Sequence, residues 1–187
     1  MSKKDTYITK LRQSRTDHLR WLNQIKLLVS GIQVDVDKIE INASESQFGN
    51  WFYTCGMIFS TQNIKKSVYE IENSLTACFE IYLKIYSTLI KTNSSGFLSG
   101  MFASSKPSNS DLLIAQQYYQ TLIETSDKML ASLRLFESQL LAMNGEKFDE
   151  LILHTNNDTQ KLEQTLENTA EFEEKKVYRY RGQVIEE

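Results

Sequence analysis

The sequence contains little proline, glycine and cysteine. One Pro and seven Gly among 187 residues leave few positions at which a helix must stop, which favours long helices. The two cysteines, Cys55 and Cys78, are too few for the disulfide framework of a secreted protein and do not form a CxxC motif. We therefore expect two free thiols and a protein of the reducing cytoplasm.

The sequence also lacks a strong charge of one sign and any long apolar run. A net charge of −3 gives no broad basic field, so we expect no nucleic-acid partner. No segment approaches the roughly 20 apolar residues that span a bilayer, and the polar N-terminus lacks the apolar core of a signal peptide. With 41% hydrophobic residues, the composition is typical of a soluble, folded protein with no membrane span.

Apolar residues recur at helical spacing in three segments, residues 5–29, 64–89 and 112–143. Such rows are typical of helices that bury one face against neighbours. The second row comprises Ile64, Val68, Ile71, Leu75, Cys78, Tyr82, Ile85 and Leu89. The third comprises Leu112, Ala115, Tyr119, Leu122, Ser126, Met129, Leu133, Phe136, Leu140 and Met143.

Shorter signals organise the connections between these helices. Gly31 favours a stop, and residues 32–43 are interpreted as a loop because a single strand would have no partner. Ser44 and Gln47 match a capping box, which predicts a second helix from there to about Phe59. Asn144-Gly145 is expected to end the long fourth helix, and a fifth with Thr at three inward positions would fold back along it.

The predicted fold class is therefore all-α, an antiparallel four-helix-bundle-like domain with long helices and an additional C-terminal helical hairpin. Residues 1–92 form the first helical region and residues 93–110 a Ser/Gly-rich linker. Residues 111–173 form the hairpin, which packs on the bundle or completes it, and residues 174–187 form a tail.

Few residues offer chemistry. His18 lies on the apolar face of the first helix, where it is either a hydrogen-bonded core histidine or a metal ligand, and one His alone makes no metal site. His154 lies in a polar stretch and is expected at the surface. The aromatic residues Trp21, Phe48 and Trp51 have the spacing of core residues. The sequence has no Ser/His/Asp set, P-loop or GxGxxG motif, so we do not expect an enzyme.

Two short segments nevertheless form a pattern. His18-Leu19-Arg20-Trp21 and Ser46-Gln47-Phe48-Gly49-Asn50-Trp51 together resemble the chemoreceptor zinc-binding (CZB) domain family. Its pattern is His-x-x-Trp, then Cys-x-(Leu/Phe)-Gly-x-(Trp/Phe), then a His-x-x-x-His helix. The resemblance covers roughly residues 10 to 90. It implies a four-helix bundle that binds zinc through three His and one Cys and that is usually attached to bacterial chemoreceptors or diguanylate cyclases.

The sequence departs from this family at the metal ligands. Ser46 stands at the cysteine position, and a serine hydroxyl that keeps its proton binds zinc poorly. The histidine pair falls at Asn73 and Ala77 without a gap, or at Ser74 and Cys78 with a shift of one residue. The chain is thus identified as a divergent member that lacks most zinc ligands.

A retained metal would have to use His18 and Cys78, which are two ligands of an incomplete site. The alternative for Cys78 is a buried thiol that packs as a small hydrophobic group. Gly49 is expected to permit close packing. No cofactor is expected, and zinc is the only metal that the pattern suggests.

These observations predict a stand-alone CZB-like sensory or regulatory protein of bacterial signal transduction and chemotaxis, with a degenerate zinc site. Its partners would be bacterial signalling proteins. The alternative is a helical scaffold or dimerisation protein that senses no small ligand and self-associates through the helical hairpin of residues 111–172.

Overall fold

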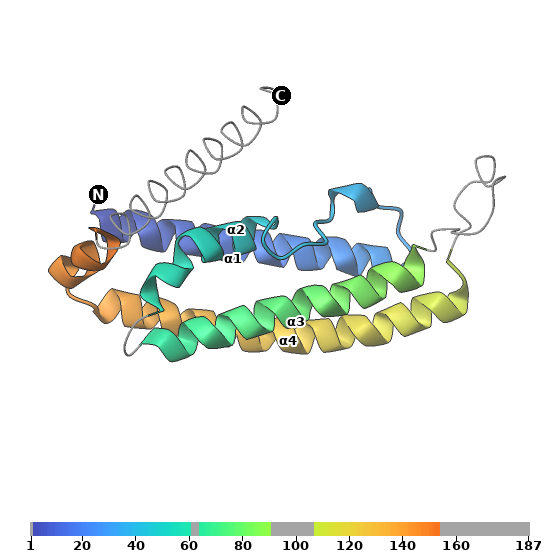
Figure 1. Cartoon of the computed structure of the whole chain (residues 1–187). Helices are drawn as coiled ribbons and strands as arrows, with labels where there is room; N and C mark the ends of the chain where they lie inside the picture. Colours follow the sequence, from blue (N-terminus) through green and yellow to red (C-terminus); the bar gives the residue numbers. More distant parts are fainter. Residues whose placement is uncertain (1, 61–63, 91–106, 154–187) are drawn as a thin grey trace, which may run out of the picture. The chain divides into compact units, whose positions relative to one another are not determined.

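The computed structural model of this chain describes residues 2–60, 64–90 and 107–153. The chain divides into two compact units, residues 1–143 and 144–187. The described residues contain helices and no strand, which confirms the predicted all-α fold. The elements of the first unit are α1 (Lys3–Val29), α2 (Gln47–Thr54), α3 (Lys65–Leu89) and α4 (Asn109–Ala142), with 3-10 turns at Val36–Lys38 and Gly56–Phe59 (Figure 1).

Helices α3 and α4 lie side by side along most of their length (Figure 1). The reason is the apolar row on each helix. Every residue of the predicted 64–89 row is buried, and the α4 row is buried from Ala115 to Leu140. Removing these rows from water is the main source of stability for such a pair, at about 25 cal/mol per Å² of apolar surface.

Helix α4 begins slightly earlier than the sequence predicts. Ser108 is its N-cap and accepts a hydrogen bond from the Asp111 N–H, while the Asp111 carboxylate accepts one from the Ser108 N–H. This capping box ends the connection at residue 108, whereas the predicted linker extends to residue 110. Most of the predicted linker lies outside the described residues.

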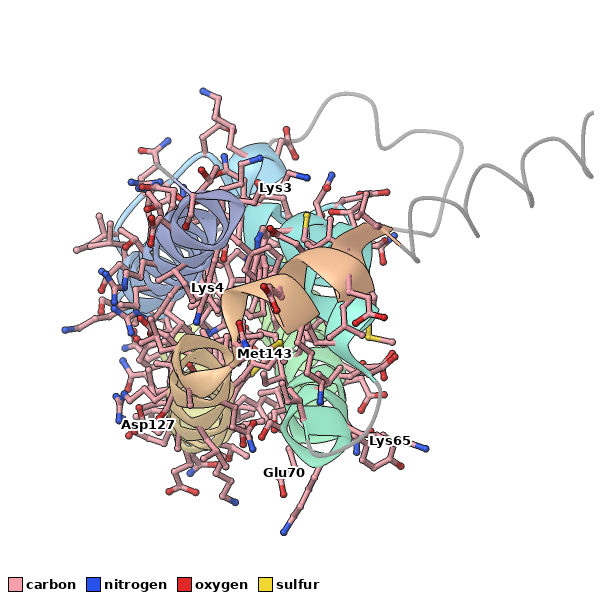
Figure 2. The ribbon with its side chains drawn as sticks, turned by 90° about the vertical axis from the view of Figure 1, so that its left-hand side faces the viewer. Lys3, Lys4, Lys65, Glu70, Asp127 and Met143 are labelled. Atoms are coloured by element: carbon pink, nitrogen blue, oxygen red, sulfur yellow. The ribbon has the colours of Figure 1, made fainter. Side chains whose placement is uncertain are left out.

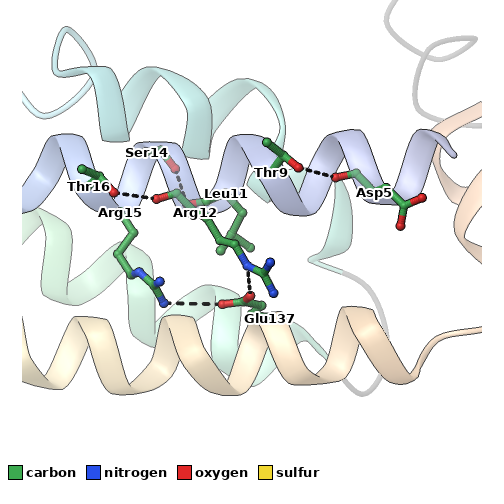
Figure 3. A network of polar contacts seen from close by, with 8 residues as sticks. All are labelled: Asp5, Thr9, Leu11, Arg12, Ser14, Arg15, Thr16 and Glu137. Carbon is green, nitrogen blue, oxygen red and sulfur yellow. Dashed lines mark hydrogen bonds and ion pairs between the residues drawn. The ribbon is translucent and has the colours of Figure 1, made fainter. Parts of the chain in front are cut away.

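Helix α1 runs antiparallel to α4 and is tied to it by polar contacts. Glu137 of α4 accepts a 2.7 Å hydrogen bond from Arg12 Nε, and its second oxygen lies 3.5 Å from Arg15 Nη1 (Figure 3). The Arg12 side chain is 55% exposed, so this ion pair contributes at most about 1 kcal/mol to stability. Its main effect is to hold the two helices in one alignment.

Both ends of this helix pair are also closed by side chains. Lys4 Nζ donates to the Leu141 and Met143 carbonyls at 2.8 and 2.6 Å, at the end of the unit that faces the viewer in Figure 2. An ammonium group there satisfies carbonyls that the last turn of a helix leaves unbonded. At the opposite end, Gln116 Nε2 donates to the Val29 carbonyl at 3.1 Å.

Residues 31–60 form a shorter layer on α1. Gly31 adopts a positive φ of 74° and turns the chain after α1, and residues 32–43 form a loop with one 3-10 turn, as predicted. The predicted capping box was wrong: the N-cap of α2 is Ser46, whose Oγ accepts from the Gly49 N–H at 3.0 Å. Ser44 lies in the turn before the cap, and the α-helix ends at Thr54, before Phe59.

The described part of the second unit is short. Helix α4 ends at Ala142, two residues before the predicted stop at Asn144-Gly145, and residues 145–153 are helical, so Gly145 is the first residue of the next helix. The remainder of the predicted fifth helix, His154 and the tail of residues 174–187 lie outside the described residues. None of the helices in the described part of the chain combines the length and the apolar character that crossing a bilayer requires.

Candidate functional site

His18 occupies the interior of the first unit, in the middle of α1. Its side chain is buried, with 2% of its surface exposed, and its Nε2 lies 2.8 Å from Ser126 Oγ on α4. The ring packs between Trp21 and Phe48, with centroid distances of 5.5 and 5.6 Å. Burial lowers the pKa of His18 to about 4, so the imidazole is neutral at neutral pH.

The contact between His18 and Ser126 has the length of a nucleophile–base pair. However, Ser126 is 1% exposed, and it is not among the residues that line the two cavities beside α1. The hydroxyl is thus covered by the protein, unlike that of an accessible nucleophile. The pair acts as a buried hydrogen bond between α1 and α4, which satisfies the imidazole inside an apolar interface.

The two segments that resemble the CZB pattern lie against each other. Phe48, at the start of α2, packs on His18 and on Trp51, and Trp51 also packs on Tyr7 of α1 with a centroid distance of 5.7 Å. Trp21 stacks on Phe79 of α3 at 4.6 Å. All these aromatic residues are buried, which confirms the prediction that Trp21, Phe48 and Trp51 belong to the core.

Gly49 permits a close approach between α2 and the turn before it. A Cβ at this position would lie 1.7 Å from the Ala43 carbonyl oxygen, far inside van der Waals contact. Ser46 Oγ donates to the same carbonyl at 2.7 Å. The glycine therefore closes the turn that brings Ser46 toward His18.

A cavity of about 120 Å³ lies between α1, the 38–48 segment and α3. His18, Ser46 and Phe48 line it at one side, and Phe79 is the residue of α3 that reaches it. Charged side chains stand around it, including Glu40 and Arg20. The cavity thus lies where the resembling segments meet, and its lining combines aromatic and polar groups.

The zinc ligands that the family would place here are not assembled. Ser46 Oγ is engaged by Ala43 and Gly49, as described above. Of the positions aligned with the histidine pair, Asn73 is exposed and Ala77 and Ser74 are half-buried. Among residues 2–60, 64–90 and 107–153, no group of three or more His, Cys, Asp or Glu is placed to hold a metal ion.

Cys78 is completely buried on the inner face of α3. Burial raises the pKa of its thiol to about 12, so the thiol keeps its proton at neutral pH. A protonated thiol is a poor metal ligand, and this packing fits the alternative of a small hydrophobic group.

Two buried polar atoms have no hydrogen-bond partner in the described part of the chain: Trp51 Nε1 and the Tyr82 hydroxyl. Tyr82 lies on α3 with its ring edge-on to Trp21, at a centroid distance of 5.4 Å. Burial raises its pKa, and the nearby charges of Tyr86 and Glu40 raise it further.

Protein-family models, curated proteins and solved structures give no match to this chain. The resemblance to the CZB family therefore depends on the two short segments alone.

Sequence reasoning missed three residues of this site. Ser126 was recognised as a member of the α4 row but not as the partner of His18, although it is the most polar residue in that row. Phe79 and Glu40 carried no motif. Phe79 is adjacent to a predicted inward position, whereas the place of Glu40 depends on loop geometry that periodicity does not encode.

Proposed function

We propose that this chain is a CZB-like regulatory protein of bacterial cytoplasmic signalling. It works without the family's four-ligand zinc site, and its output is a change in helix packing that partner proteins recognise. The observation that carries the proposal is the contact of His18 with Phe48, which brings the two resembling segments together around one cavity.

The layer that carries the cavity is suited to such a response. The 38–48 segment and α2 cover α1 from one side, and the buried pair of His18 and Ser126 joins α1 to α4 on the other. Binding in the cavity would favour one position of the 38–48 segment over others. A partner protein that contacts this layer would then bind with a different affinity. Packing of the α3 and α4 rows supplies the rigid base.

Restoring the missing ligands tests the relationship directly. Ser46→Cys combined with Ser74→His and Cys78→His places a thiol at the family's cysteine position and two histidines at the positions aligned with a shift of one residue, where Ser74 is half-buried and Cys78 is buried. With His18 these would complete a tetrahedral Cys/His₃ set. We expect about one equivalent of zinc in the purified triple variant and none in the wild type, measured by elemental analysis.

The matched control places the histidines at the ungapped positions, as Asn73→His and Ala77→His, together with Ser46→Cys. Because Asn73 is exposed, this variant should bind zinc weakly or not at all. A second control adds His18→Ala to the restored variant and should remove the metal. Equal zinc binding with and without His18 would contradict the proposed relationship.

The signalling role is tested by pairwise interaction assays against the chemoreceptors and diguanylate cyclases of a bacterium that carries this gene. We expect at least one specific interaction whose strength changes in His18→Ala, provided that circular dichroism shows the variant to be folded. An interaction that is indifferent to every change around the cavity would favour the scaffold hypothesis instead.

One observation bears on that scaffold hypothesis. The α4 row, which we considered as a docking face for a partner helix, is buried within the first unit from Ala115 to Leu140. A partner would have to use another face of α4, on which Leu113, Ile114, Leu135 and Leu141 are exposed. The observation supports the sensory proposal over the scaffold.

A further inference from the structure

The charged side chains of the cavity beside His18 differ in whether they are paired. Two acidic and two basic side chains line it: Asp17, Glu40, Arg20 and Lys38. Arg20 Nη1 lies 2.6 Å from Asp17 Oδ1, and Lys38 Nζ lies 2.7 Å from Asp35 Oδ2, which is outside the lining. The carboxylate of Glu40 makes no ion pair or hydrogen bond within the described residues, so it is the charged group of the lining that a ligand can pair with.

Glu40 is held in place by its backbone, so its side chain is available. The Trp21 indole N–H donates to the Glu40 carbonyl at 3.1 Å, which anchors this residue to α1 while leaving the carboxylate half-buried. A half-buried carboxylate accepts hydrogen bonds and donates none, so it is suited to a ligand that donates them.

The other features of the cavity point to a cationic ligand and not to an anion. The start of α2 would favour negative charge, but the Ser46 Oγ already accepts the Gly49 N–H there. The two basic side chains at the rim are exposed and already paired. Phe48 and Phe79 offer apolar wall for a short alkyl group. A volume of about 120 Å³ holds several waters or a molecule of roughly four to six non-hydrogen atoms.

We propose that this cavity binds a small organic cation with N–H donors, a protonated primary amine or a guanidinium compound, through the Glu40 carboxylate. The inference deepens the proposed function, on which it rests, by naming the class of ligand to which the bundle responds. The ligand's N–H groups pair with the Glu40 carboxylate, and its short alkyl part lies against Phe48. Entry of the cation fixes the 38–48 segment against α1.

The test is a titration of the full chain with methylammonium, ethylammonium and guanidinium chloride, followed by NMR of the Trp21 indole N–H. Trp51→Phe assigns that signal, since the chain has two tryptophans. Sodium acetate and neutral acetamide at equal ionic strength serve as size-matched comparisons. We expect a saturable shift with at least one cation and only weak, linear shifts with acetate and acetamide.

Glu40→Gln should weaken binding about tenfold or more, because a charge-assisted hydrogen bond is replaced by a neutral one. Asp37→Asn is the matched control: it removes one negative charge from the same loop, but at an exposed residue outside the cavity lining, and should leave affinity unchanged. Equal weakening by both variants would mean only a general charge effect and would overturn the proposal. Saturable binding of acetate, or no saturation with any cation, would do the same.

This experiment and the zinc experiment test different proposals, because the restored zinc site uses no oxygen of Glu40. Zinc binding without cation binding would support the proposed relationship to the CZB family and contradict the proposed class of ligand. Cation binding without zinc binding by the triple variant would support the ligand site and contradict the proposed relationship to the CZB site.

Discussion

Replacement of Gly49 by alanine is expected to lower the free energy of unfolding of the first unit by about 3 kcal/mol. The added methyl carbon would lie 1.7 Å from the Ala43 oxygen and 2.7 Å from its carbonyl carbon, so backbone and not a flexible side chain would have to move. Alanine is the better helix former by roughly 1 kcal/mol, but this gain is smaller than the cost of the clash. Urea unfolding followed by circular dichroism measures the difference.

Gly145→Ala provides the matched control for this substitution. Gly145 is also helical, and a Cβ there meets nothing within 4 Å. The same chemical change should therefore be neutral or stabilise by about 0.5 to 1 kcal/mol. If Gly49→Ala were as stable as the wild type, the close approach of the Ala43 turn to α2 would be wrong, and with it the position of Ser46 beside the cavity.

Acidification is expected to destabilise the protein through His18. Its pKa is about 4 in the folded protein and is taken as the ordinary 6.5 in the unfolded chain, so the unfolded state binds the proton more readily. The stabilisation is fully present above about pH 6.5, is lost as the pH falls from there, and stops declining below about pH 4. A difference of this size corresponds to a loss of about 3 kcal/mol across that window.

The variant His18→Gln isolates this contribution. A glutamine amide can still hydrogen-bond to Ser126 but does not titrate. Subtracting the variant's free energy of unfolding from that of the wild type at each pH therefore cancels the contributions of all other titratable groups, including His154. We expect the difference to change with pH only between about 6.5 and 4. A wild-type His18 ring that titrates near 6.5 by NMR would show that the imidazole is not desolvated.

The helices could be predicted because their apolar rows are long. In the 64–89 segment every predicted inward residue, from Ile64 to Leu89, is buried. The start of α2 could not be placed so well. Ser44 and Ser46 are both serines that can cap a helix, and the choice between them depends on the turn of residues 42–46, where the Ser46 N–H bonds to the Asn42 carbonyl at 3.2 Å.

The candidate site was predictable in part. His18 and the segment that begins at Ser46 were identified from the resemblance, and the partner of His18 was within reach. In an antiparallel helix pair, a residue faces the one that lies equally far from the adjacent end of the other helix. His18 lies 15 residues after Lys3 (18 − 3), and Ser126 lies 16 residues before Ala142 (142 − 126). Glu40 was out of reach, because its position follows from a loop with no repeating pattern.

The bond between His18 and Ser126 also determines how α1 can slide along α4. Of the residues seven positions away, Leu11 and Ile25 on α1 and Leu133 on α4 are aliphatic, and Tyr119 on α4 is aromatic. A slip of one heptad that placed His18 opposite Leu133 and Ser126 opposite Ile25 would therefore leave an imidazole nitrogen and a hydroxyl buried without partners, at a cost of about 1 to 3 kcal/mol for each. The pair thus favours the observed register over this slipped one, which the apolar residues alone would tolerate, as a buried asparagine does in coiled coils.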